Sequence, residues 1–271
     1  SYYFLPVALT GEEGPQQVTW RLTDSLARSR YAPRHVNRMS ELPHQLARFA
    51  RGDSMLLLAA YRTSDAALAR DDARGALALW NGSVTEIHGA TTANRISTVT
   101  RARHAFASVE VHGVRSRHAQ RARYGIAPLD CDPSWCLSDL MFVEAAHTDS
   151  APEPELALQH ALEEPSIPAG QPLGVYWELQ SSAGRSPIRV SLTVTPVRVS
   201  VLRRMASTLR LARPVTPVRL QWQTPPRRER EPYQVTMRLP EELRGRFRVL
   251  LVVERDGHAP QSAEREIVVR R

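Results

Sequence analysis

Lysine is absent from this chain of 271 residues, and cysteine and aromatic side chains are scarce. All 36 basic residues are arginines, only two residues are cysteines, and aromatic residues make up 6%. No apolar run reaches the roughly 18 residues that a membrane-spanning helix needs. Apolar residues nevertheless make up 42% of the chain. This share is enough for a packed core and excludes a disordered or fibrous class.

The chain also lacks the short motifs that identify common enzymes. It has no glycine-rich phosphate loop, no dinucleotide fingerprint, no G-x-S-x-G elbow and no H-E-x-x-H. We therefore expect a binding or structural protein without a cofactor rather than an enzyme. One alternative is a metal enzyme that uses His104, His112 and His118, which requires strand pairing to bring the three rings onto one face. Exposed polar histidines explain the same pattern.

The net charge of +8 is spread unevenly along the chain. Residues 1–150 hold 17 arginines and 15 acidic residues, residues 151–184 hold five acidic residues and no arginine, and residues 185–271 hold 19 arginines and eight acidic residues. A basic last third fits an acidic protein partner, anionic lipid headgroups or a nucleic acid. Many of these arginines alternate with apolar residues, however, which favours the solvated outer face of a sheet over a nucleic-acid surface.

One group of arginines stands apart from this alternation. Arg227, Arg228 and Arg230 follow two prolines, and the pattern predicts the charged tip of a hairpin. A solvated loop explains them. Clustered guanidinium groups also bind carboxylates in a bidentate manner, so an acidic partner is the functional interpretation.

The two cysteines, Cys131 and Cys136, are separated by four residues. This spacing is not that of a redox C-x-x-C motif, and no histidine ligand lies nearby to complete a zinc site. A disulfide that closes a short loop is expected outside the cytoplasm, and two reduced thiols are expected inside it. Of these two states we favour the disulfide. The sequence begins at Ser1 rather than Met, which favours a processed or trimmed chain, as after removal of a signal peptide.

The first residues are unusually aromatic. Tyr2, Tyr3, Phe4 and Leu5 form either an edge strand on a core or an arm that docks on a partner or a lipid surface. Residues 41–50 favour a short helix with Ser40 as its cap. We therefore assign residues 1–44 to an N-terminal arm and short helix.

A period of two begins near residue 53. Strands are expected at residues 54–63, 75–80, 95–100, 104–112, 118–125 and 137–145. Close strand spacing without long helices indicates a first β-sandwich over residues 45–147. Residues 148–171 contain several prolines and most of the acidic excess, which indicates a linker with a short helix near residues 155–163.

The last hundred residues alternate most clearly. At residues 188–195, Ile, Val, Leu and Val alternate with Arg, Ser, Thr and Thr, and residues 218–222 and 233–239 do the same. This pattern is typical of antiparallel sheets with one solvated face. The sequence therefore predicts a mainly β protein with two immunoglobulin-like β-sandwich domains, the second at residues 172–271, joined by the proline-rich linker.

Four phrases of the chain resemble a known bacterial family. They are residues 49–54 (FARGDS), 137–141 (LSDLM), 173–179 (LGVYWEL) and 239–247 (LPEELRGRF). Together they resemble the β-rich region of secreted gemmatimonad-type proteins that are named after a GWxTD motif, over roughly residues 45–271. That motif itself is absent from this chain. The resemblance implies an extracytoplasmic protein without known catalytic residues.

The photosystem of the same bacterial group carries membrane-extrinsic polypeptides that hold a reaction centre inside a light-harvesting ring. An arginine-rich chain of two sandwiches is similar to what that role implies. The expected function is thus a periplasmic, membrane-peripheral structural subunit whose partners are reaction-centre and antenna polypeptides, with lipid headgroups as further contacts and no nucleic acid. A free periplasmic or outer-surface adaptor is the alternative.

Overall fold

A computed structural model of the chain describes residues 36–71, 73–80, 85–89, 94–101, 105–132, 134–145, 151–181, 186–197 and 217–271. Of these residues, 61% lie in strands and 6% in helices. The prediction of a mainly β protein of the sandwich type is therefore confirmed. The chain divides into two compact units, unit 1 (Ser1–Pro128) and unit 2 (Leu129–Arg271).

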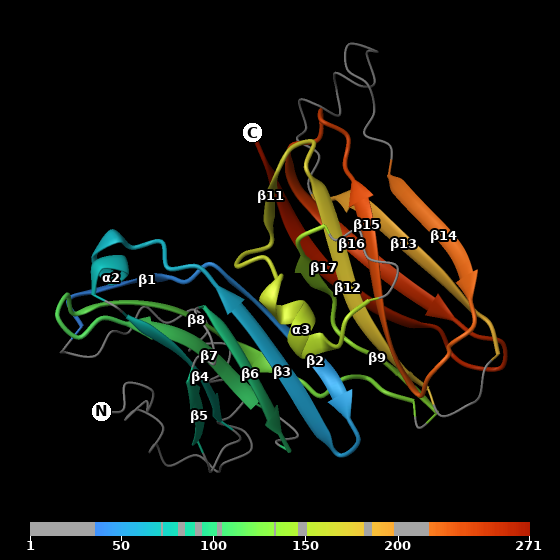
Figure 1. The fold of residues 1–271 in the computed structure, drawn as a ribbon, viewed down its shortest axis with the longest axis horizontal. Helices are drawn as coiled ribbons and strands as arrows, with labels where there is room; N and C mark the ends of the chain where they lie inside the picture. Colours follow the sequence, from blue (N-terminus) through green and yellow to red (C-terminus); the bar gives the residue numbers. More distant parts are fainter. Residues whose placement is uncertain are drawn as a thin grey trace. The chain divides into compact units, whose positions relative to one another are not determined.

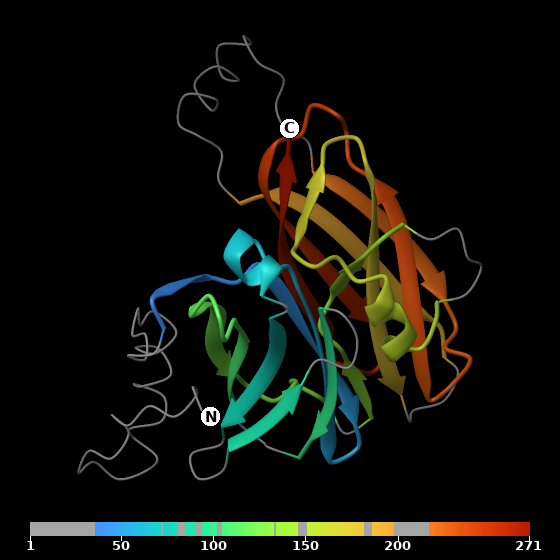
Figure 2. The same ribbon diagram turned by 60° about the vertical axis from the view of Figure 1, so that its left-hand side comes forward.

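The described residues of unit 1 form two sheets and one short helix, α2 (Ala66–Arg70) (Figures 1 and 2). The larger sheet has the order β1-β8-β7-β4-β5, and the smaller has the order β2-β3-β6. The strands are β1 (Arg38–Glu41), β2 (His44–Arg51), β3 (Ser54–Tyr61), β4 (Arg74–Trp80), β5 (Thr85–Gly89), β6 (Arg95–Thr100), β7 (Ala105–His112) and β8 (His118–Ile126). All neighbours are antiparallel except β1 and β8.

The core of unit 1 lies between these two sheets, because alternate residues of each strand point to it. Leu57 of β3 and Val109 of β7 are fully buried there. Gly75 of β4 lies against the ring of Tyr61, and a Cβ atom at residue 75 would overlap that ring. Glycine is thus required at this position by the close approach of an aromatic side chain from the facing sheet.

The short helix expected at residues 41–50 is wrong, because these residues form the end of β1 and most of β2. Phe49 and Ala47 are fully buried on one side of β2, whereas Leu46 belongs to the core on the other side. Burial on both faces gives β2 no clear alternation, so its sequence resembles an amphipathic helix. Pairing with β3 from His44–Tyr61 to Arg51–Ser54 decides the outcome.

Unit 2 is a sandwich of two sheets (Figure 1). One sheet has the order β10-β12-β15 with β9 also paired to β12, and the other has the order β11-β17-β16-β13-β14. The strands are β9 (Trp135–Leu137), β10 (Met141–Val143), β11 (Ser166–Pro168), β12 (Pro172–Ser181), β13 (Ile188–Pro196), β14 (Val218–Thr224), β15 (Arg230–Arg238), β16 (Gly245–Glu254) and β17 (Gln261–Arg270). A short helix, α3 (Pro154–Gln159), precedes β11.

The alternating residues of the second half pack as their pattern predicts. Val190 and Leu192 of β13 and Val249 and Leu251 of β16 face Trp177 of β12 in one buried cluster. The residues between them point outward and are exposed or half-buried. Each fully buried aliphatic side chain of this kind stabilises the fold by about 1.5–3 kcal/mol relative to an exposed one.

The boundary between the units differs from the predicted one at residues 147–148. β9 and β10 belong to unit 2, because β9 pairs with β12 from Leu137–Leu179 to Trp135–Ser181 and β10 pairs with β12 from Met141–Tyr176 to Val143–Gly174. The described part of the predicted linker also belongs to unit 2. It supplies α3, and β11 pairs with β17 in parallel. Prolines mark the ends of these short elements here and do not indicate a free linker.

Candidate binding surface

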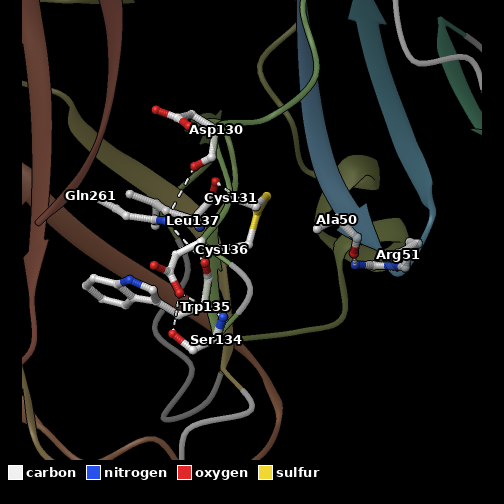
Figure 3. The surroundings of a disulfide bond; sticks show 10 residues. Ala50, Arg51, Asp130, Cys131, Ser134, Trp135, Cys136, Leu137 and Gln261 are labelled. Carbon is white, nitrogen blue, oxygen red and sulfur yellow. Dashed lines mark hydrogen bonds between the residues drawn. A yellow bond between two sulfur atoms is a disulfide. The ribbon is translucent and has the colours of Figure 1, made fainter. Parts of the chain in front are cut away.

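The disulfide joins Cys131 to Cys136, with their Cα atoms 4.5 Å apart (Figure 3). Cys131 is exposed, whereas Cys136 lies on β9 and is 5% exposed. Trp135, which directly precedes Cys136, is buried in the core of unit 2. The disulfide therefore ties an exposed loop directly to a strand of the core.

Gln261, the first residue of β17, holds the same loop through its side-chain amide. Its Oε1 accepts a hydrogen bond from the backbone N–H of Leu137 at 2.6 Å, and its Nε2 donates to the carbonyl oxygens of Trp135 at 3.1 Å and Asp130 at 3.4 Å (Figure 3). The side-chain amide thus accepts a hydrogen bond from the backbone of this loop and donates others to it, as a peptide group of a neighbouring strand would. It links β17, in one sheet of the sandwich, to β9, in the other.

Three side chains at this loop are of the types found in serine hydrolases, but their order is different. Ser134 Oγ lies 3.0 Å from His258 Nδ1 and also donates to the carboxylate of Asp132. In a hydrolytic triad the histidine stands between the other two residues, takes the proton of the serine and later gives it to the leaving group. Here the serine stands between them. The Ser134 hydroxyl and backbone N–H hold the pKa of Asp132 below its ordinary value, as expected of a turn-capping carboxylate.

The predicted arginines lie where β14 turns into β15. Arg227, Arg228 and Arg230, which we call the arginine tip, are all exposed. Arg228 Nη1 lies 3.6 Å from an Oε atom of Glu153, just before α3. The backbone of the tip is fixed by a 2.6 Å hydrogen bond that Ser181 N–H donates to the carbonyl of Glu229. The tip therefore presents its charges from a loop that is fastened to β12.

Tyr233 lies two residues along β15 from Glu231, on the row that faces into the sandwich. Its ring stacks on Trp177, with centroids 5.6 Å apart, and Trp177 also meets Trp222 of β14 at 6.1 Å. Burial, and then the negative charge of Glu231, raise the pKa of the Tyr233 phenol, and Arg227 partly offsets them. The charge of Arg227 thus acts on the phenol of Tyr233.

Three other described arginines of unit 2 form ion pairs with acidic residues. On its five-stranded sheet, Arg189 pairs with Glu254 at 3.0 Å and Arg248 with Glu264 at 3.6 Å. Arg270 pairs with Glu164 at 2.7 Å. The interpretation of the alternating arginines as a solvated face agrees with this arrangement. Arg227 and Arg230 have no carboxylate partner among the residues that the structure describes, and the same holds for Arg219, Arg238, Arg246 and Arg271.

The histidines of the metal-enzyme alternative are only partly described. His104 lies outside the described residues. His112 ends β7 and pairs in register with Ala119, and His118 Nδ1 lies 3.0 Å from the carboxylate of Asp65, the N-cap residue of α2. Within the described ranges, no three side chains of the His, Cys, Asp or Glu type are grouped so that they could hold a metal ion.

The predicted apolar anchor, Tyr2, Tyr3, Phe4 and Leu5, also lies outside the described residues. Sequence reasoning found the cysteines and the arginine tip. It missed Gln261, His258 and Glu153, which lie far from their partners in the chain and follow no motif. No helix in the described part of the chain combines the length and the apolar character needed to span a membrane.

Comparison with known proteins gives distant similarities of fold. No protein-family model matches the chain, and no curated protein is significantly similar to it. The solved α2-macroglobulin of E. coli in its native conformation shares 15% identity over 85% of this chain and 16% of its own, with a TM-score of 0.29. A Salmonella α2-macroglobulin mutant gives 14% identity, 84% and 16% coverage, and a TM-score of 0.29.

A third similar structure is that of a 1.5-MDa bacterial ice-binding adhesin. It shares 12% identity over 86% of this chain and 65% of its own, with a TM-score of 0.26. The chain spans only 16% of the length of the two macroglobulins. At TM-scores this low, none of these likenesses assigns a family or a function to the chain.

Proposed function

We propose that the chain is a non-catalytic, membrane-extrinsic structural subunit that braces a membrane protein complex from the periplasm. The arginine tip is the observation that carries this proposal. Three exposed guanidinium groups on a fastened loop form a ready contact for carboxylates of a partner. An exposed ion pair contributes about 0–1 kcal/mol, so several must act together with an apolar contact. The first residues of the chain are our candidate for that contact.

The periplasmic location is supported by the disulfide between Cys131 and Cys136. Disulfides persist in oxidising compartments and are rare in the cytoplasm. The resemblance to secreted gemmatimonad-type proteins supports the same compartment. We therefore propose a photosynthetic reaction centre within its light-harvesting ring as the complex, and a role of the kind that a membrane-extrinsic S subunit has there.

The test is to purify the native protein in mild detergent and to identify what accompanies it. We expect pigment and membrane subunits to remain with the chain. A protein that runs alone would refute the bracing role and would favour a free periplasmic or outer-surface adaptor.

Replacing the arginine tip gives the matching genetic test. Arg227→Gln, Arg228→Gln and Arg230→Gln together should lower the amount of complex that co-purifies, because three contacts to acidic groups are lost. The control carries Arg238→Gln, Arg246→Gln and Arg271→Gln, which removes the same charge from exposed positions elsewhere in unit 2. Equal losses in both variants would indicate net charge rather than a defined contact.

A further inference from the structure

β14 forms an open edge of unit 2. It is the last strand of the order β11-β17-β16-β13-β14, so among the described strands it pairs with β13 alone (Figure 1). Alternate backbone N–H and C=O groups of an edge strand point away from the sheet. Within the described ranges, none of the seven residues of β14 has a backbone hydrogen bond on that outer side.

Among the described strands of unit 2, the other edge strands have features that hinder strand addition, and β14 lacks these features. β9, β10 and β11 have three residues each. β15 contains Pro232, which cannot donate a backbone hydrogen bond, and it turns the charged Glu231 toward the inside. Short strands, prolines and inward charges are the usual means of blocking an edge. β14 is seven residues long and contains no proline.

The apolar row of β14 is also incompletely covered. Val218, Leu220 and Trp222 are half-buried, although they pack against the core of the sandwich. The equivalent residues of the next strand, Val190 and Leu192, are at most 1% exposed. The greater exposure of the β14 side chains is expected for a strand with a neighbour on one side, because side chains of adjacent strands cover each other.

The basic residues on and after β14 favour an acidic partner. Its outward row consists of Arg219, Gln221 and Gln223, which contains no carboxylate, and the arginine tip begins three residues after its end. A second copy of the chain paired along β14 would bring two such basic surfaces together. A segment with carboxylates on its outward row would instead lie opposite Arg219 and continue onto the arginine tip.

We propose that β14 accepts an extended acidic segment of a partner protein as an additional strand of the five-stranded sheet. Backbone hydrogen bonds to β14 hold the segment, apolar residues at alternate positions cover Leu220 and Trp222, and carboxylates between them face Arg219. The inference deepens the proposed function and rests on it, since it specifies how a subunit of the complex would be held.

The test uses the full chain and three fluorescein-labelled peptides of seven residues. Peptide EIEIEIE has the required alternation, EEEEIII has the same composition without it, and KIKIKIK has the alternation with the opposite charge. Fluorescence anisotropy should show binding of EIEIEIE about tenfold tighter than either control, since only this peptide combines strand pairing with complementary charge. Equal binding of the two acidic peptides would overturn the inference, because the arginine tip alone would then explain it.

Two variants locate the binding edge. Arg219→Glu should weaken EIEIEIE binding by about fivefold or more, as expected for the loss and reversal of one contact. Arg246→Glu makes the same change on the outward row of β16, which is separated from β14 by β13, and should weaken it by less than about twofold, because salt screens exposed charges beyond about 10 Å. Both positions are exposed, and circular dichroism checks that both variants fold. Equal losses in the two variants would overturn the inference.

Hydrogen exchange gives a readout that electrostatic attraction does not affect. Bound EIEIEIE should slow amide exchange in β14 and leave β15 unchanged, because new backbone hydrogen bonds form along one edge alone. Unchanged exchange in β14, or a dimer formed through β14 without peptide, would overturn the inference. If the chain co-purifies with membrane subunits but does not bind EIEIEIE, the inference fails and the proposed function stands. If the chain binds EIEIEIE but does not co-purify with membrane subunits, the proposed function fails and the strand-addition site on β14 stands.

Discussion

The carboxylate of Asp65 and the ring of His118 hold helix α2 against the larger sheet of unit 1, with Oδ2 and Nδ1 3.0 Å apart. The other carboxylate oxygen, Oδ1, accepts hydrogen bonds from the backbone N–H groups of Ala67 at 2.7 Å and Leu68 at 3.3 Å. Asp65 therefore caps the helix and binds the strand at the same time. The contact with His118 is not visible as a motif, because Asp65 and His118 are 53 residues apart.

This pair predicts a dependence of stability on pH. Burial raises the pKa of Asp65, but the backbone N–H groups and His118 outweigh it, so the pKa lies below its ordinary value of 3.8. The unfolded chain then binds the proton more tightly. The contribution of Asp65 is fully present above the ordinary value and is lost as the pH falls through the lower, folded pKa.

Urea unfolding between pH 5 and about pH 2 measures this loss. Asp65→Asn keeps an N-cap acceptor but does not titrate, so the variant should lose less stability over this range than the native chain. The same pH dependence in both proteins would show that other carboxylates are responsible. Asp71 and Asp132 also have lowered pKa values and are the next candidates.

Removal of the disulfide should destabilise the chain modestly. Cys131 and Cys136 close a loop with a sequence separation of five, and the loop entropy corresponds to about 2 kcal/mol at 25 °C. We expect a Cys131→Ser, Cys136→Ser variant to unfold at a lower denaturant concentration and to keep its far-ultraviolet circular dichroism, since Gln261 and the buried Trp135 still hold β9. Loss of the β signal would mean that the disulfide is needed for folding itself.

Mass spectrometry of the native protein under non-reducing conditions tests the compartment separately. We expect a mass two hydrogens lower than that of the reduced chain, without reaction with a thiol reagent. Two free thiols in protein taken directly from cells would contradict the periplasmic location.

Gly75→Ala should destabilise unit 1. A methyl group at this position overlaps the ring of Tyr61, which is 2% exposed and cannot move freely in the core. Overpacking of this kind costs about 1–3 kcal/mol. Gly89→Ala is the matched control, because it lies on β5 of the same sheet and its Cβ would meet no atom within 4 Å. Equal stability of the two variants in chemical denaturation would contradict the requirement for glycine at residue 75.

The proposed function has two candidate anchors, the first residues of the chain and the arginine tip, and removing each should weaken attachment to a different degree. Deletion of residues 1–9 should weaken attachment to the membrane complex more than the triple replacement of Arg227, Arg228 and Arg230 by Gln, because buried aromatic side chains contribute most to interface energies. Quantitative mass spectrometry of the co-purified subunits measures both. The opposite order would make the arginine tip the main anchor.

The sequence by itself determined the alternating strands of the second half, such as β13, β14 and β15, and the mainly β class of the protein. In β13, the buried Val190 and Leu192 alternate with Arg189 and Ser191, and a period of two specifies both a strand and its inner face without further information. A different local signal, two consecutive prolines followed by charged residues, placed the arginine tip after Pro226. In such regular patterns the sequence itself indicates which side chains are buried, because alternation is a property of consecutive residues.

The tertiary structure decided what depends on distant partners. β2 is a strand because it pairs with β3, although its burial on both faces hides the alternation. β9 and β10 belong to unit 2 because they pair with β12, whose last residue is about 40 positions further along the chain. The edge position of β14 and the hydrogen bond that Leu137 N–H donates to the Gln261 side chain likewise exist only once the sheets have formed. A local pattern contains no information about which strand will be its neighbour, so pairing, edges and long-range hydrogen bonds follow from the packed fold.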